Sequence, residues 1–259
     1  SGYAQKGIRV HGSGMSRSAL KVAGERNYRD FREDKVLQLR QFQIALRKLR
    51  LLSSKDDGAR TELNVTKTIE KTCDRGGRLE LVLERPRKNQ TKLLLLMDSG
   101  GSMWAYADLC NRLFQAVNQA SQFKDLKIYY FHNCFYDQLF TAPQCKWEDK
   151  VSTEWVLHNL KPEYKVIVVG DATMGPAELL EPGGTLDYDH ENDKAGIDWI
   201  KTLKKRFTSA VWLNPLHEKL WDYDASTRTI QIIREQFPMF PLTVQGLEAA
   251  IKELRKGEA

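Results

Sequence analysis

The chain has 259 residues, 41% of them hydrophobic, with 40 Lys and Arg against 34 Asp and Glu and a net charge of +6. This size and apolar content are enough for one large α/β domain with an appendage. No apolar stretch approaches the ~20 residues that cross a bilayer, and no signal peptide is recognised, so the composition argues against a membrane-spanning or secreted protein.

The four cysteines are few and scattered, and no pair has C-x-x-C spacing. Such cysteines are typical of reduced thiols in a cytosolic protein rather than of a disulfide framework. We therefore expect a cytoplasmic location. The cysteines are Cys73, Cys110, Cys134 and Cys145.

The positive charge is concentrated in the N-terminal part. Residues 1–60 contain 14 Lys and Arg and 6 Asp and Glu, a net charge of +8, whereas 26 against 28 in the remainder give −2. Such a segment either contacts nucleic acid or an acidic protein, or forms a solvated face, which the interspersed acidic residues favour. Residues 1–24, rich in Gly, Ser and basic residues, predict an extended arm. Because the chain starts at Ser-Gly without a methionine, we expect an N-terminal part to be missing.

Residues 34–52 are predicted to form a helix, because apolar residues recur there at three- and four-residue steps. Those residues are Leu39, Phe42, Leu46 and Leu49. A loop follows at 55–60. We therefore expect two regions, a basic arm and helix at residues 1–60 and the main domain at residues 61–259.

A short helix is expected to follow, capped by Asn64, running to Cys73 and stopped by Gly76-Gly77. Leucine then recurs at every second position of residues 79–83, with the charged Glu80 between the first two, which predicts a half-buried strand.

The strongest strand signal is the run 93–97, four leucines and a methionine, which is followed directly by Asp98-Ser99-Gly100-Gly101-Ser102. A continuous apolar run without alternation is typical of a strand buried on both faces of a parallel sheet. A helical period from 104 to about 123 can cover that sheet. The polar segment therefore lies at the carboxyl end of a central strand, where open α/β sheets bind ligands.

A second buried strand, at 166–169, is also followed by an aspartate, Asp171. Two apolar strands that each deliver a carboxylate to one edge of the sheet indicate a divalent cation site. Mg²⁺ takes carboxylate, hydroxyl and water oxygens, and these are the ligand types present.

Aromatic strands at 126–131 and 135–140 are expected to form a hairpin or an edge pair, with His132 at the turn. His132 is a possible ligand or base, but a structural role is favoured. A helix is predicted at 151–160.

The C-terminal third is expected to contain helices at 176–180, 195–207, 230–237 and 243–254, the last capped by Thr243, with the last strand at 209–213. An acidic loop at 182–193 offers a second set of metal-ligand types, but a solvated loop is favoured because no spacing brings them to one face. Those residues are Asp187, Asp189, His190 and Glu191.

The segment 98–102, Asp-Ser-Gly-Gly-Ser, resembles the D-x-S-x-S motif of von Willebrand factor A (VWA) domains, with Gly100 in place of the middle serine. In that family the motif opens a metal-ion-dependent adhesion site, which usually holds Mg²⁺ and otherwise Mn²⁺ or Ca²⁺. The family takes a threonine from a loop between the two strands, so Thr153 is the candidate here, although the family's G-G-T pattern is absent. The site residues that the resemblance implies are Asp98, Gly100, Ser102, Thr153 and Asp171.

The order of an N-terminal helix, a glycine turn, the strand at 79–86 and the motif is similar to that of intracellular CoxE-like VWA proteins. The resemblance implies a Rossmann-like α/β fold over about residues 60–255, with a mostly parallel central sheet and helices on both faces. Proteins of this kind tend to be encoded beside MoxR-type AAA+ ATPases. It therefore implies a binding module that works with such an ATPase in maturing or remodelling another protein.

We favour a non-enzymatic, metal-dependent binding module, in which an Asp or Glu of a partner protein fills an open coordination position. A metal-dependent hydrolase or phosphotransferase is the alternative, since Mg²⁺ with two carboxylates also suits phosphoryl chemistry. It is disfavoured because neither strand-end aspartate is part of a D-x-D nucleophile, and because the sequence has no phosphate-binding G-x-x-x-x-G-K-[ST] loop and no nucleophile elbow. RNA binding through the basic arm is a third alternative, but no RNA-binding fingerprint supports it. We expect neither nucleic acid nor a membrane as a partner.

Overall fold

A computed structural model of the chain describes residues 31–49, 59–85, 91–119, 123–185, 192–222 and 227–256. The arm expected at residues 1–24 lies outside the described residues, as do Asp187, Asp189, His190 and Glu191 of the acidic loop.

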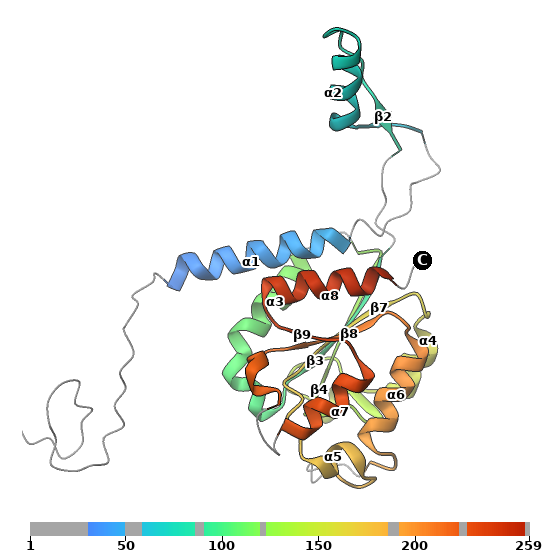
Figure 1. Cartoon of the computed structure of the whole chain (residues 1–259). Coiled ribbons are helices and arrows are strands. Elements are labelled where there is room, and N and C mark those ends of the chain that lie inside the picture. The colour runs from blue at the N-terminus through green and yellow to red at the C-terminus, as the bar shows by residue number, and fades with distance from the viewer. Residues whose placement is uncertain are drawn as a thin grey trace, which may run out of the picture.

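The centre of the fold is a seven-stranded sheet in the order β6-β5-β4-β3-β7-β8-β9 (Figure 1). The five strands from β4 to β9 pair in parallel, whereas β5 runs antiparallel to both β4 and β6 at one edge. The mostly parallel sheet expected from the sequence is therefore confirmed. The strands are β3 (Lys92–Asp98), β4 (Asp125–Phe131), β5 (Gln138–Phe140), β6 (Lys150–Ser152), β7 (Lys165–Val169), β8 (Ala210–Asn214) and β9 (Met239–Pro241).

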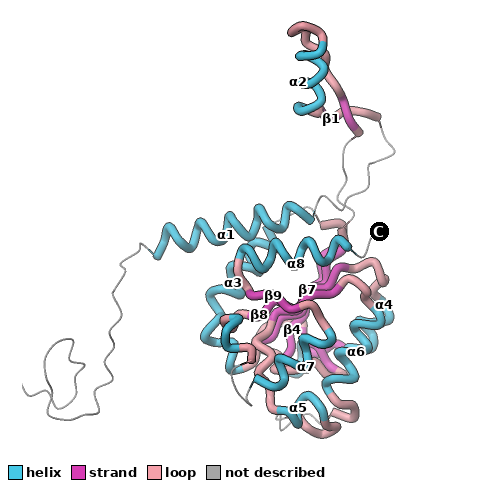
Figure 2. The backbone as a smooth tube through the Cα atoms, viewed as in Figure 1, coloured by secondary structure: helices cyan, strands magenta, loops and turns pink. Residues whose placement is uncertain are grey.

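Helices cover both faces of this sheet, as expected (Figure 2). One face carries α1 (Phe31–Arg47), α3 (Ala107–Gln119) and α8 (Val244–Lys256). The other carries α4 (Thr153–Asn159), α5 (Pro176–Leu180), α6 (Gly196–Arg206) and α7 (Arg228–Gln236). None of the described helices is long and apolar enough to cross a membrane.

The central strand β3 explains why its sequence shows no alternation. Leu94 and Leu96 belong to the core under α4 to α7, whereas Leu93 and Leu95 belong to the core under α1, α3 and α8, and all four are fully buried. Successive side chains of a strand point to opposite faces, so a strand with a core on both faces is apolar at every position.

Helix α1 is part of the main core. It packs against α3 and α8, and Phe42 and Leu46 of the helix, with Leu49 just after its end, are buried in the core shared with β3. These three were expected to form the apolar face of the helix, and burying each contributes roughly 1.5–3 kcal/mol of hydrophobic stabilisation. The N-terminal helix therefore belongs to the same hydrophobic core as the sheet.

Residues 59–85 form a small unit of their own, which Figure 1 shows projecting away from the sheet. It contains β1 (Glu62–Leu63), α2 (Val65–Asp74) and β2 (Leu83–Glu84), and β1 pairs antiparallel with β2. The N-cap is confirmed, because Asn64 Oδ1 accepts the N–H of Lys67 at 2.8 Å. The expected stop is also confirmed: Gly76 and Gly77 have positive φ of 63° and 90°, which glycine adopts at no steric cost.

The half-buried strand predicted at residues 79–83 is wrong. Leu79 and Leu81 are 70% and 61% exposed, and the paired segment is only Leu83–Glu84. The alternation is real, but the intervening residues face α2: Glu80 pairs with Lys71, and the Val82 N–H donates to Thr68 Oγ1. A two-stranded ribbon has no second layer to cover its other face.

Two further predictions need correction. The helix expected from residue 104 begins as a 3₁₀ turn, η2 (Gly101–Tyr106), before α3. The strand at 210–214 is not the last one, because β9 adds to the sheet beyond it. The three residues of β9, Met239–Pro241, are too few to show a periodic signal in the sequence. They form a strand because the chain, after α7, returns alongside β8.

Other expectations about the second half are confirmed. The β4–β5 pair is antiparallel, and α4 to α8 lie within a few residues of their predicted ranges. Thr243 begins α8 as expected, since its Oγ1 accepts the N–H of Gly246 at 3.0 Å.

Candidate metal site

The two predicted carboxylates lie at one edge of the sheet. Strands β3 and β7 are parallel neighbours in which Met97 pairs with Val169, so Asp98 and Asp171 follow at the same carboxyl edge. Both side chains are 5% exposed. A Cβ on Gly170 would lie 3.0 Å from Asp98 Cβ and 3.3 Å from Asp98 Oδ2, so a glycine here allows the two strand ends to approach closely.

The two oxygens of the Asp98 carboxylate have different surroundings. Oδ1 accepts two backbone N–H groups, from Gly100 at 2.8 Å and from Asn133 at 3.1 Å. Oδ2 is buried and has no hydrogen-bond partner among the described residues. Buried polar atoms in proteins are nearly always paired, so this carboxylate oxygen is available to a water or to a ligand.

The surroundings of Asp98 disfavour its negative charge. Burial raises its pKa from 3.8 to about 7; the hydrogen bonds from Gly100 and Asn133 oppose this, while the charges of Asp171 and Glu178 add to it. A cation placed here would offset both the burial and the repulsion between carboxylates.

Asp171 is held by the loop after β7. Its Oδ1 accepts the N–H of Thr173 at 3.0 Å, and its backbone carbonyl accepts Asn214 Nδ2 at 2.8 Å. The next residue, Ala172, has a φ of 59°, which turns the chain sharply behind the carboxylate.

Thr153 is the first residue of α4, directly after the edge strand β6. Because β6 reaches β4 through two antiparallel steps, it runs parallel to β3, and Thr153 lies at the same edge as Asp98. Its backbone N–H donates to Asp137 O at 2.8 Å. The side chain is fully buried, and Oγ1 has no hydrogen-bond partner in the described part of the chain.

Ser102 and Gly100 belong to the turn after β3. Ser102 is exposed in the first turn of η2. Its neighbour Ser99 turns away, with Oγ donating to Phe131 O at 3.2 Å. A hydrogen bond thus joins Asp98 to Gly100, and the charge of Asp171 raises the pKa of Asp98. Ser102 and Thr153 lie at the same edge of the sheet, on η2 and α4.

Two residues around Asp98 were missed by the sequence analysis, Asn133 and Glu178. At the turn after β4, His132 was the predicted candidate, but its side chain is exposed. The residue that contacts Asp98 is Asn133. Asn133 has a φ of 53°, a conformation that asparagine tolerates better than most residues. An asparagine two residues after the end of a strand was the available signal. Glu178, 5% exposed, has no comparable signal in the sequence.

The donor set fits a hard cation bound by mixed oxygen ligands. In the described ranges, no three His, Cys, Asp or Glu side chains are grouped so as to hold a metal ion by themselves. Hydroxyl and water oxygens are therefore needed in addition to carboxylates, and Mg²⁺ is usually bound in this way. The unpaired Asp98 Oδ2 and Thr153 Oγ1 are two such oxygens.

An apolar pocket of about 220 Å³ lies next to Asp98, lined among others by Met103, Trp104, Cys110 and Tyr130. Trp104 is 82% exposed at the rim, two residues after Ser102. Burial raises the pKa of the Cys110 thiol to about 12, so this thiol is protonated at neutral pH.

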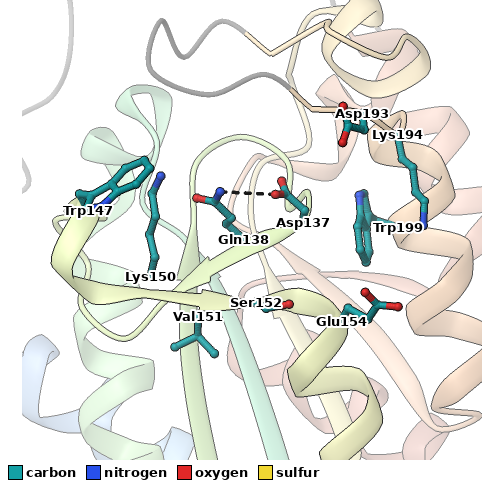
Figure 3. Close-up of a pocket in the computed structure, with 10 residues that line it drawn as sticks. All are labelled: Asp137, Gln138, Trp147, Lys150, Val151, Ser152, Glu154, Asp193, Lys194 and Trp199. Carbon is teal, nitrogen blue, oxygen red and sulfur yellow. Dashed lines mark hydrogen bonds between the residues drawn. The ribbon is translucent and has the colours of Figure 1, made fainter.

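A larger cavity of about 490 Å³ lies beside Ser152 and Glu154, the neighbours of Thr153 (Figure 3). Its walls combine charged and polar side chains with two tryptophans and a valine. The Nζ of Lys150 sits 3.3 Å from the ring centre of Trp147, and Gln138 Nε2 donates to Asp137 Oδ2 at 3.4 Å.

Comparison with known families finds one similarity, which covers the N-terminal half of the domain. Residues 36–137 match the family described as VWA domain containing CoxE-like protein. Over these residues the chain is similar to the CoxE-like VWA family. The match begins within α1 and ends at the residue before β5. It includes the segment 98–102 and Asn133, whereas Thr153, Asp171 and Glu178 lie beyond it.

Other comparisons add nothing to the CoxE-like assignment. No curated protein matches the chain. Among solved structures, a serine palmitoyltransferase from S. paucimobilis with bound PLP-myriocin aldimine is 12% identical, with a TM-score of 0.30, over 85% of this chain and 53% of that one. The Sphingomonas wittichii serine palmitoyltransferase is 9% identical, with a TM-score of 0.30, over 85% and 51%. The chain thus spans about half the length of the structures it matches, and scores this low support no inference about fold or function.

Proposed function

We propose that this CoxE-like VWA protein is a non-enzymatic, metal-dependent protein-binding module. Asp98, Ser102, Thr153 and Asp171 would hold Mg²⁺, or Mn²⁺ or Ca²⁺ in its place. When bound, the ion supplies an open coordination position that a carboxylate of a partner protein can fill. The observation that carries the proposal is the pair of buried oxygens without hydrogen-bond partners, Asp98 Oδ2 and Thr153 Oγ1.

The surface around the site supports a protein partner. Trp104 is almost fully exposed at the rim of the apolar pocket beside Asp98. Aromatic residues are enriched in protein–protein interfaces, and an exposed tryptophan beside a pocket offers apolar contact around a central charged group. A partner segment with an Asp or Glu next to an apolar side chain fits this combination.

The chemistry of the site supports binding over catalysis. The Cys110 thiol beside Asp98 is held in its protonated form by burial, and burial raises the pKa of the Cys134 thiol further still. A protonated thiol is a poor nucleophile. The described side chains that contact Asp98 therefore include no activated nucleophile.

The family resemblance supports a role beside a MoxR-type AAA+ ATPase, in the maturation or remodelling of another protein. In such an arrangement the VWA protein would recognise a carboxylate-bearing segment while the ATPase supplies the work. The proposal predicts that association with the ATPase or with the remodelled protein requires the cation.

Thermal unfolding with added metal tests the proposal. Mg²⁺ or Mn²⁺ should raise the melting temperature, because an ion that binds only the folded state stabilises it by mass action. Asp98→Ala should abolish the shift, whereas Asp222→Ala, which removes an exposed partner of Arg234, should retain it. A wild type that shows no melting shift and no binding heat at ~10 mM of either ion contradicts the proposal.

Co-purification tests whether the association with the ATPase depends on the metal. A MoxR-type AAA+ ATPase from the same organism should be retained by the wild type with Mg²⁺ present. It should be lost with EDTA and with Asp98→Ala, and kept with Asp222→Ala. Equal retention by all four samples would leave the metal without a role in that association.

A further inference from the structure

The space beside Gly100 is filled by the side chain of Asn133. A Cβ on Gly100 would lie less than 3.0 Å from Asn133 Oδ1, 3.2 Å from Asn133 N and 3.0 Å from Asp98 Oδ1. Real Cβ atoms essentially never approach other atoms more closely than 3.0 Å. The serine that VWA motifs carry at this position is therefore incompatible with Asn133 where it stands.

The orientation of the Asn133 amide is set by its hydrogen bonds. Its Nδ2 donates to Glu178 Oε1 at 3.1 Å, and a carboxylate oxygen can only accept. Glu178 is itself fixed, because its Oε2 accepts the N–H of Gly175 at 2.7 Å at the start of α5. With Nδ2 directed at Glu178, the carboxamide oxygen Oδ1 faces Gly100 and Asp98.

The backbone of Asn133 is held equally firmly. Its N–H donates to Asp98 Oδ1 at 3.1 Å, and the adjacent Cys134 side chain is 3% exposed in the core. The Asn133 oxygen therefore stands next to the Asp98 carboxylate on a turn that is anchored at both sides.

We infer that Asn133 Oδ1 replaces the hydroxyl missing at position 100 and is an oxygen ligand of the cation that Asp98 binds. This inference rests on the proposed function and adds a ligand to the same site. A carboxamide oxygen is a neutral, hard donor like a serine hydroxyl, so the exchange keeps both the ligand type and the charge of the site. Gly100 and Asn133 are then a matched pair: the glycine makes room for the asparagine, and the asparagine supplies the oxygen that the glycine lacks.

Mn²⁺ titration by calorimetry, with electron paramagnetic resonance of the bound ion as a second readout, tests the inference. Asn133→Ala should weaken Mn²⁺ binding about 10-fold or more. Gly100→Ser should lower the melting temperature without metal, because the new side chain meets Asn133. Asn159→Ala, on α4 with its Nδ2 donating to Trp155 O, is the control and should bind as the wild type does.

The double variant Gly100→Ser/Asn133→Gly provides the sharper test. Glycine accepts the positive φ at position 133, and its missing side chain leaves room for the serine hydroxyl. The double variant should recover both the melting temperature that Gly100→Ser loses and most of the Mn²⁺ affinity that Asn133→Ala loses. Its resonance spectrum should show one bound ion, as in the wild type.

The outcomes separate the two proposals. A wild type that binds Mn²⁺, with an Asn133→Ala variant that binds equally well, overturns the assignment of Asn133 and leaves the metal-dependent module standing. A double variant no better than Asn133→Ala also overturns it. A wild type that binds no Mn²⁺ overturns the proposed function together with this inference.

Discussion

The backbone N–H of Asn133 donates to Asp98 Oδ1 at 3.1 Å, although the two residues are 35 positions apart and follow different strands. The bond ties the end of β4 to the end of β3 at the edge of the sheet. It also fixes the Asp98 carboxylate so that Oδ1 is satisfied while Oδ2 remains unpaired. The same carboxylate therefore holds the turn after β4 through Oδ1 and leaves Oδ2 unpaired.

Replacement of Asp98 by asparagine should separate folding from metal binding. Asp98→Asn removes the charge that burial and the neighbouring carboxylates oppose, while keeping the shape of the side chain. At about pH 8 and without metal, the variant should melt at a higher temperature than the wild type, and its response to Mg²⁺ should be lost. Differential scanning calorimetry with and without Mg²⁺ measures both effects. A metal-free variant less stable than the wild type would show that the Asp98 charge stabilises the fold.

The titration of Asp98 should make the free energy of unfolding depend on pH. Its pKa is about 7 in the folded chain against 3.8 ordinarily, so between these values the folded state binds more protons than the unfolded state. The free energy of unfolding should therefore fall as the pH rises from about 4 to about 7, and the loss should be complete above that range. Urea unfolding of wild type and Asp98→Asn, compared across this range in EDTA, isolates the contribution. Parallel curves for the two proteins would contradict it.

The N-terminal helix should stabilise the whole domain. Leu46→Ala removes a side chain of α1 that is 2% exposed in the core shared with β3, and it should cost about 2–5 kcal/mol. Ile44→Ala, on the same helix but 54% exposed, should change stability by less than about 0.5 kcal/mol. Chemical unfolding followed by tryptophan fluorescence reports on the core. Equal midpoints for both variants would show that α1 is dispensable.

Glycine at position 246 should be required by the packing of α8 on the end of β9. A Cβ there would meet the backbone carbonyl of Pro241 at less than 3.0 Å, and a backbone atom cannot move aside as a side-chain tip can. Gly246→Ala should cost about 2 kcal/mol or more and lower the melting temperature by about 5 °C or more. Gly101→Ala is the matched control, because a Cβ at that position meets nothing within 4 Å. The prediction fails if the two variants melt together.

Several features of this protein were determined by its sequence alone. The unbroken apolar run before Asp98 indicated a strand with a core on both faces, and the core is split between Leu94 and Leu95 as that requires. Asn64 and Thr243 were recognised as helix caps because capping depends on residues three positions apart. Placing Asp98 and Asp171 at one edge needed only that both strands be parallel members of one sheet.

Only the tertiary structure decided what surrounds those carboxylates. Asn133 contacts Asp98 because β4 lies next to β3 in the sheet and because residue 133 adopts a turn conformation with positive φ. Glu178, which follows β7, then accepts a hydrogen bond from the Asn133 amide. That Leu79 and Leu81 are exposed depends on the lack of a second layer over the small unit at 59–85. Periodicity and capping act between near neighbours in the sequence. Contacts between strand ends are set by packing across the whole sheet, so no local pattern in the sequence could reveal that Gly100 and Asn133 share one space.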